Sequence, residues 1–433
     1  MLPIINWQTL SADAKRQQLT RPIDQSTNQK IVAGIIKKVR EEADSALIQL
    51  TREFDKVALS SLKVAQGDID NAAIKKTEEN ALRQALKTIN SLHEAFLPSA
   101  QTLETAPGIM IERFYRSIQA VGLYVPGGNN TPLVSSLLMQ ALPAVIAGCP
   151  IRVLCTPPNP QGSIAPALLV AARLCQIDTI YLVGGAQAIA AMAYGTETIP
   201  KVDKIFGPGN AFVTEAKTQV SIDPEGAAID MPAGPSEVMI VADSEANPDF
   251  VAADLLAQAE HGADSQVFLI CDSVDWAEKV NKALEQQLST LSRQAIIRQS
   301  LSKSAILLSD DREAVLQIIN QYAPEHLILN CEGATSWVKN IYNAGTIFIG
   351  PWAAETMGDY VTGSNHVLPT NGFARNHSGL SVTDFLTSFT VQTITREGIE
   401  SLGKAAYTLA MMEGLDAHAN AVVQRLNNLG EGT

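Results

Sequence analysis

Apolar residues recur every three or four positions from about residue 27 to residue 54, with lysine, arginine and glutamate between them. This period predicts an amphipathic helix that turns one face towards a core. The same pattern predicts a second helical stretch from about residue 72 to residue 96. Residues 1–24 lie outside both helices, and we expect them to form a short N-terminal arm.

Short β-branched runs, each followed by glycines and an alanine-rich helical stretch, fill residues 124–231. This alternation indicates βαβ units and a mainly parallel sheet. The expected strands are residues 151–155, 179–183 and 204–206.

A second set of strands is expected after the glycine-rich block, at residues 238–242, 266–271, 305–308, 326–329 and 346–349. The predicted fold class is therefore α/β, with two Rossmann-like domains and mainly parallel sheets. We expect the first domain to be discontinuous and to contain residues 25–123 and 236–376. The second domain, residues 124–235, would then be an insertion.

The strand pattern stops after about residue 376, so residues 377–433 are expected to form a helical tail. Residues 397–427 have the pattern of two helices that are interrupted at Gly414, with Asp416 placed to cap the second. A tail of this length cannot build its own core. We expect it to pack on another surface, such as that of a partner subunit.

The chain has 433 residues, of which 46% are hydrophobic, enough to fill at least two cores. Its formal net charge of −13 and its lack of a basic run argue against a nucleic-acid binder. The first residues lack the regions of a signal peptide, and the most apolar stretch, 137–148, is interrupted by Gln140 and Pro143. We therefore expect a cytoplasmic protein with no membrane segment.

The cysteines have no CxxC spacing, and their odd number leaves at least one unpaired in a monomer. Reduced thiols are therefore expected. None stands in a polar, electropositive motif that would lower its pKa, so no cysteine is assigned a catalytic role. They are Cys149, Cys155, Cys175, Cys271 and Cys331.

Five of the six histidines lie between positions 261 and 418, and four of these keep company with carboxylate or carboxamide side chains. Such groups can hold a divalent metal of the zinc or manganese kind and leave one His–Glu pair for proton transfer. A single histidine is more often solvated or capping, but four together indicate an active site. The four groups are Gln258 to His261, Glu325 with His326, Asp359 to His366, and Glu413 to His418.

Gln258 and His261 lie three residues apart on a helix expected to start near Pro248, so both side chains share one face and can share a metal. A histidine near a helix end also suits the helix dipole, which is the ordinary alternative. Glu325 and His326 are adjacent at the entrance to a strand and point in different directions. They could flank one substrate from two sides.

Glycine loops at residues 184–185 and 207–209 each follow an expected strand and precede a helix. Backbone N–H groups in such loops can approach a pyrophosphate. Because no GxGxxG fingerprint is present, ordinary turn glycines remain an open alternative.

Seven motifs together resemble the histidinol dehydrogenase family, and the resemblance covers essentially the whole chain. They are GLYVPGG (122–128), VGGAQA (183–188), KIFGPGN (204–210), DMPAGPSE (230–237), QAEH (258–261), PEHL (324–327) and GSNHVLP (363–369). The resemblance implies oxidation of L-histidinol to L-histidine through L-histidinaldehyde, the last step of histidine biosynthesis, with two hydride transfers to NAD. It also implies one Zn²⁺ per subunit and a homodimer whose subunits share residues in each active site.

The resemblance also implies a role for each site residue. The implied zinc ligands are Gln258, His261, Asp359 and His418. These four, together with Ser236, His326, His366 and Glu413, are implied to bind substrate. The implied NAD-binding residues are Tyr124, Gln187 and Asn210, which puts the cofactor on the domain at 124–235, beside the loop at 129–131.

The implied catalytic residues are Glu325 and His326. His326 takes the alcohol proton as hydride leaves, Glu325 activates water so that the aldehyde becomes a hydrate, and His326 deprotonates that hydrate. A cysteine thiohemiacetal route is disfavoured by the thiol surroundings. Two other readings stay open, a zinc hydrolase in which Glu325 activates water and a metal-dependent ligand sensor with no turnover.

Overall fold

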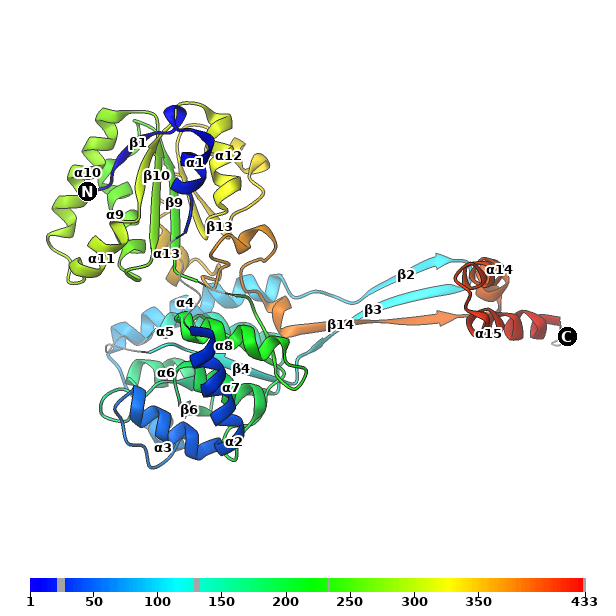
Figure 1. The fold of residues 1–433 in the computed structure, drawn as a ribbon. Coiled ribbons are helices and arrows are strands. Elements are labelled where there is room, and N and C mark those ends of the chain that lie inside the picture. Colours follow the sequence, from blue (N-terminus) through cyan, green and yellow to red (C-terminus); the bar gives the residue numbers. More distant parts are fainter. Residues whose placement is uncertain (22–27, 128–132, 233, 431–433) are drawn as a thin grey trace.

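The computed structural model describes residues 1–21, 28–127, 133–232 and 234–430, which form two α/β units and a long arm (Figure 1). Mainly parallel sheets confirm the expected α/β fold class. The loop expected on the cofactor side, 129–131, lies outside the described residues. Positions 128 and 233 of the sequence motifs lie outside them too.

A six-stranded parallel sheet forms the first unit, in the order β1-β11-β10-β9-β12-β13. Helices cover both faces, which explains why its strands read as continuous apolar runs. The strands are β1 (Ile4–Asn6), β9 (Glu237–Ala242), β10 (Gln266–Cys271), β11 (Ala305–Leu308), β12 (His326–Asn330) and β13 (Thr346–Ile349). One face carries α9 (Pro248–Ala259), α10 (Val274–Leu288) and α11 (Gln294–Leu301), and the other carries α12 (Arg312–Tyr322). Helix α1 is Ala12–Gln18, and α13 is Glu355–Tyr360.

A five-stranded parallel sheet forms the second unit, in the order β6-β5-β4-β7-β8. Its strands are β4 (Ala120–Tyr124), β5 (Ile151–Thr156), β6 (Ile180–Leu182), β7 (Lys204–Phe206) and β8 (Ala228–Ile229). One face packs against α3 (Gln66–Asn71), α4 (Lys76–Ala95), α5 (Val134–Ile146) and α6 (Pro166–Leu174). The other packs against α2 (Asn28–Phe54), α7 (Gly185–Tyr194) and α8 (Ala211–Ile222).

The N-terminal third lies elsewhere than the sequence suggested. Helices α2 and α4 pack on the five-stranded sheet, whereas residues 25–123 were expected to join the unit with 236–376. The N-terminal segment, which was expected to be a short arm, instead contributes β1, and this strand pairs with β11 at the edge of the six-stranded sheet. A helical period predicts that a face is buried, but it does not identify the sheet that covers it. Helix α2 is also kinked, at Ala43, where φ is 47°.

The long arm, which is distinct from the N-terminal segment, is a three-stranded antiparallel sheet. Its strand order is β14-β3-β2, and two helices lie at its far end (Figure 1). The strands are β2 (Gln101–Ala106), β3 (Ile109–Ser117) and β14 (Leu386–Ile394), and the helices are α14 (Arg396–Met412) and α15 (Asp416–Asn427). The expectation that strands stop after residue 376 is therefore wrong. Strand β14 is mostly exposed and lacks a continuous apolar run, so pairing with β3 stabilises it instead of a core.

The break between α14 and α15 confirms the expected interruption at Gly414, which has a φ of 71°. Asp416 is the first residue of α15, and no side-chain capping bond forms there. The short 3₁₀ helices are η1 (Trp7–Thr9), η2 (Ala334–Asn340), η3 (Phe373–Arg375), η4 (Val382–Phe385) and η5 (Asn428–Gly430). In the part of the chain described, no helix combines the length and the apolar character needed to cross a membrane.

The segment after α13 connects the two units. Asn365 donates a hydrogen bond of 2.7 Å from Nδ2 to the carbonyl oxygen of Met139 in α5. Val367 and Leu380 belong to the core that α4 and α5 share. The lower end of the six-stranded sheet thereby stays close to the five-stranded unit (Figure 1).

Candidate active site

The candidate site lies at the amino ends of the neighbouring strands β9 and β12. Ser236 immediately precedes β9, and His326 is the first residue of β12. The last turn of α9 carries Gln258, and the short helix α13 carries Asp359. Four separate elements therefore supply side chains to the end of the six-stranded sheet at which β9 and β12 begin.

The imidazole of His326 is at the centre of this site and only 3% of the residue is exposed. Its Nδ1 lies 3.2 Å from the carbonyl oxygen of Glu237 and 3.4 Å from Nε2 of Gln258. The same nitrogen lies 3.6 Å from a carboxylate oxygen of Glu325 and 3.8 Å from one of Glu355. Because a carbonyl can only accept, a proton on Nδ1 donates to Glu237, and this contact orients the ring.

The other ring nitrogen of His326, Nε2, faces Asp359, whose Oδ1 is 3.7 Å away. This distance is too long for a hydrogen bond, and Nε2 has no hydrogen-bond partner among the described residues. The same holds for Oε1 of Gln258 and Oε2 of Glu355, which are also buried. Three such atoms in one site indicate a place for a ligand or an ion.

His261 and His366 flank Asp359. Nδ1 of His261 lies 3.5 Å from Oγ of Ser236. Nδ1 of His366 donates a hydrogen bond of 2.7 Å to the carbonyl oxygen of Asp359. Burial lowers the pKa of His366, which favours its neutral form.

Opposite charges stabilise one another across this site. Burial lowers the pKa of His326, but the carboxylates of Glu355 and Glu325 outweigh burial and raise that pKa well above its ordinary value. Burial raises the pKa of Glu355 well above its ordinary value. Burial also acts to raise the pKa of Asp359, yet the facing His326 outweighs it and lowers that pKa. The protein alone therefore favours a protonated His326 opposite an ionised Asp359.

Glu355 was not predicted from the sequence, although it is 1% exposed and lies in the site. Ligand atoms of His326, Glu355 and Asp359 lie within 4.8 Å of one another, close enough to hold one metal ion. The missed signal is the spacing of Glu355 and Asp359, which are four residues apart and so share a face of α13. Glu237 was also missed, because only its main chain touches His326.

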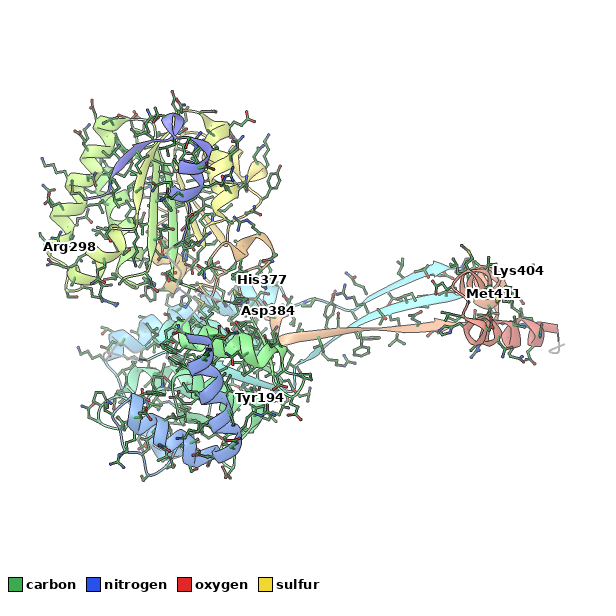
Figure 2. The ribbon with its side chains drawn as sticks, viewed as in Figure 1. Tyr194, Arg298, His377, Asp384, Lys404 and Met411 are labelled. Atoms are coloured by element: carbon green, nitrogen blue, oxygen red, sulfur yellow. The ribbon has the colours of Figure 1, made fainter. Side chains whose placement is uncertain are left out.

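Glu413 and His418 do not join this site within one chain. Both are exposed, at the end of α14 and in α15. Figure 2 shows Lys404 and Met411 of α14 at the far end of the arm, away from both α/β units. Of the nine metal, substrate and catalytic residues predicted from the sequence, these two are therefore separated from the other seven.

The three residues expected to bind NAD lie at the carboxyl edge of the five-stranded sheet. Tyr124 ends β4, Gln187 lies in the first turn of α7 and Asn210 precedes α8. Oη of Tyr124 accepts a hydrogen bond of 3.0 Å from the N–H of Gly185, and burial raises the pKa of this tyrosine. The Asn210 side chain caps α8 by accepting two backbone N–H bonds of 3.1 Å. Ligands of open α/β sheets bind at this edge.

The similarity to known proteins agrees with this arrangement. The crystal structure of histidinol dehydrogenase from Elizabethkingia anophelis superimposes with a TM-score of 0.95 and 42% identity, covering 99% of this chain and 98% of that one. The family model described as histidinol dehydrogenase matches residues 19–426. The chain belongs to the histidinol dehydrogenase family.

Curated relatives in the histidinol dehydrogenase family are similar over their whole length. The protein of Legionella pneumophila (strain Paris) is 62% identical over 431 residues, covering 100% of both chains. That of Colwellia psychrerythraea (strain 34H) is 48% identical over 427 residues, covering 98% of each chain. As a member of the histidinol dehydrogenase family, the chain is an oxidoreductase of histidine biosynthesis.

Proposed function

We propose that this enzyme oxidises L-histidinol to L-histidine through L-histidinaldehyde, with two hydride transfers to NAD and one zinc ion per subunit. Family membership supports histidinol as the substrate. The observation that best supports the chemistry is the buried His326, whose Nε2 has no partner among the described residues and faces Asp359. The carboxylates alone favour the protonated ring, but the charge of a bound cation would offset them, and a neutral buried imidazole with one unpartnered ring nitrogen suits a general base.

The donor set fits a zinc ion. We assign the metal to Gln258, His261 and Asp359, with His418 as a fourth ligand, and Oε1 of Gln258 is buried with no hydrogen-bond partner in the described part of the chain. Imidazole, carboxylate and carboxamide are ligands that zinc accepts. Bound there, the cation supplies coordination positions for the substrate and a positive charge that offsets the carboxylates around His326.

The chain's own residues then divide the proton transfers. His326 accepts the hydroxyl proton of histidinol as the carbinol carbon loses a hydride. His326 then releases that proton to solvent, Glu325 removes a proton from the water that adds to the aldehyde, and His326 deprotonates the resulting hydrate as its carbon loses the second hydride. Gln258 donates a hydrogen bond of 3.3 Å from Nε2 to Oε2 of Glu325, which holds that carboxylate at the site. We assign substrate contacts to Ser236 and His366 as well.

We further propose that two subunits form a homodimer in which the arm of each completes the site of the other. Glu413 and His418 are then supplied by the partner. The arm supports this proposal because its helices expose large apolar side chains on a segment that touches neither α/β core. They are Leu402, Tyr407, Leu409, Met411, Met412 and Leu415, each at least 40% exposed.

We assign NAD to the carboxyl ends of the strands of the five-stranded sheet, where Tyr124, Gln187 and Asn210 lie. The geometry that supports this is the carboxyl edge of a parallel sheet beside two helix N-termini. We place the enzyme in the cytoplasm, where reduced thiols are the rule, because all five cysteines are free.

The proposal is tested by NADH formation with histidinol, before chelation, after it and after zinc is returned. We expect two NADH per histidine formed, loss of activity on chelation and its recovery with zinc. His261→Asn should lose metal and nearly all turnover while its circular dichroism stays native, because two α/β cores form without the ion. A zinc hydrolase would form no NADH. If His261→Asn kept its full zinc content and full activity, His261 would not be a zinc ligand.

A further inference from the structure

Arg21 and Glu237 form a buried ion pair next to the candidate active site. Their side chains are 13% and 2% exposed. Arg21 Nε lies 2.5 Å from Oε1 of Glu237 and Nη2 lies 2.8 Å from Oε2, so the pair is bidentate. Nη2 also donates a hydrogen bond of 2.7 Å to the carbonyl oxygen of Tyr322, and the guanidinium lies 4.0 Å from the centre of the Tyr322 ring.

Three segments that are distant in the sequence meet at this carboxylate. Arg21 comes from the N-terminal segment, and Glu237 is the first residue of β9. The N–H of Asn371, in the segment after α13, donates a hydrogen bond of 3.0 Å to Oε1 of Glu237. A buried pair of this kind gains little stability over apolar residues of the same size, because desolvation offsets the attraction. Its presence therefore suggests a role other than stability.

The main chain of Glu237 contacts both proposed catalytic residues. Its N–H donates a hydrogen bond of 2.8 Å to Oε2 of Glu325. Its carbonyl oxygen lies 3.2 Å from Nδ1 of His326. The position of this one residue therefore sets the orientation of the Glu325 carboxylate and of the His326 ring, whose Nε2 then faces Asp359.

We propose that the Arg21–Glu237 ion pair is a positioning element for proton transfer, which fixes the main chain that holds Glu325 and His326. Neither residue of the pair touches the reacting atoms. The inference rests on the proposed roles of Glu325 and His326.

The first test uses Arg21→Lys and Glu237→Gln in the zinc-loaded enzyme. Lysine keeps the charge but not the bidentate fork, and glutamine keeps the shape but not the charge. Partners that orient active-site groups typically contribute about 10- to 100-fold to activity, so kcat should fall by this factor. The KM for histidinol and the zinc content should change little. Because the pair holds both catalytic residues, histidinol oxidation and aldehyde oxidation should be impaired alike.

Arg40→Lys is the matched control. Its guanidinium also pairs with carboxylates, at 2.9 Å from Asp223 and 2.5 Å from Glu225, and stacks 4.4 Å from the ring centre of Tyr194. Tyr194 lies on the five-stranded unit (Figure 2). We expect wild-type kcat from this variant.

The double variant Arg21→Met, Glu237→Leu separates positioning from stability. It removes both buried charges and should keep the melting temperature near that of the wild type. Positioning predicts that its kcat stays low. Recovery of kcat in the double variant, or unchanged kcat in both single variants, would overturn the inference. Glu325→Gln is measured in parallel. If Glu325→Gln oxidises aldehyde at the wild-type rate, the proposed function itself fails. If Glu325→Gln loses aldehyde oxidation while Arg21→Lys and Glu237→Gln keep wild-type kcat, only the positioning role is refuted.

Discussion

In the proposed mechanism the neighbouring residues Glu325 and His326 accept protons from different groups, and a single substitution can separate their roles. Glu325→Gln keeps the shape of the side chain but cannot take a proton from water. We expect it to slow oxidation of supplied aldehyde by roughly 10²- to 10⁴-fold, the usual contribution of a general base, and to affect histidinol oxidation much less. His326→Asn should impair both steps. Equal losses in both half-reactions of Glu325→Gln, measured by stopped-flow NADH absorbance, would contradict this division.

Gly345 packs against the main chain of Glu325 and so constrains the position of the proposed catalytic pair. A Cβ at Gly345 would lie 2.5 Å from the carbonyl oxygen of Glu325, a backbone atom that cannot swing away. Gly345→Ala should therefore displace β12 at its first residues, cost roughly 1–3 kcal/mol of unfolding free energy and reduce turnover. Gly34→Ala in α2 is the control, since a Cβ there meets no atom within 4 Å. Similar melting temperatures and rates for both variants would contradict the argument.

The site residues differ in how well the sequence predicts them. Gln258 lies in the last turn of α9 as expected, but His261 lies two residues past the end of that helix, so the expected pairing of the two on one helix face is wrong. His326 lies at the start of a strand, as its sequence position indicated. Glu355 and Glu237 were not predicted, because their importance depends on contacts made across the fold. His418 shows the reverse case, since the family resemblance implies it as a zinc ligand while α15, which carries it, lies at the far end of the arm (Figure 1).

Among the elements, the end of α2 carries a pH-dependent contribution. Asp55 follows α2, its Oδ2 is buried with no partner among the described residues, and burial raises its pKa to about 6. A raised carboxyl pKa gives stability that is complete below the unfolded pKa of about 4 and is lost as pH rises through the folded value. Asp55→Asn should therefore melt higher than the wild type at pH 8, with the gap closing towards pH 4.

The control for that experiment is Asp13→Asn in α1, where the side chain is 94% exposed. Differential scanning calorimetry of the three proteins from pH 4 to pH 8 gives the comparison. The buried carboxylate would be ruled out as the cause if the difference in melting temperature between Asp55→Asn and the wild type did not change with pH. It would also be ruled out if Asp13→Asn showed an equally large difference.

The elements themselves were largely predictable where burial is regular. Parallel strands such as β10 and β12 are covered on both faces, so their apolar runs are continuous. Strand β14 escaped prediction because its threonines and glutamine face solvent and only pairing with β3 holds it extended. The placement of α2 was wrong for a different reason: its apolar stripe fits either sheet, and only the packing against α7 and α8 decides.

At the scale of the whole molecule, the arm determines what one chain can do alone. The other residues proposed to hold the metal or act as bases lie where β9 and β12 of the six-stranded sheet begin, whereas α15, which carries His418, lies at the end of the arm (Figure 1). A single subunit therefore lacks part of the proposed ligand set. We therefore expect activity to require two copies of the chain that share their sites.

Complementation between two inactive variants can show whether two subunits share their sites. His418→Ala and His326→Asn should each be inactive as homodimers. In a mixed dimer, the site on the His418→Ala body keeps its own His326 and receives an intact arm from its partner. Mixing under conditions of subunit exchange should then restore up to about half of the native activity per mixed dimer, because one of two symmetric sites is whole. If native mass spectrometry confirms exchange and activity stays at zero, the arm does not complete the partner's site.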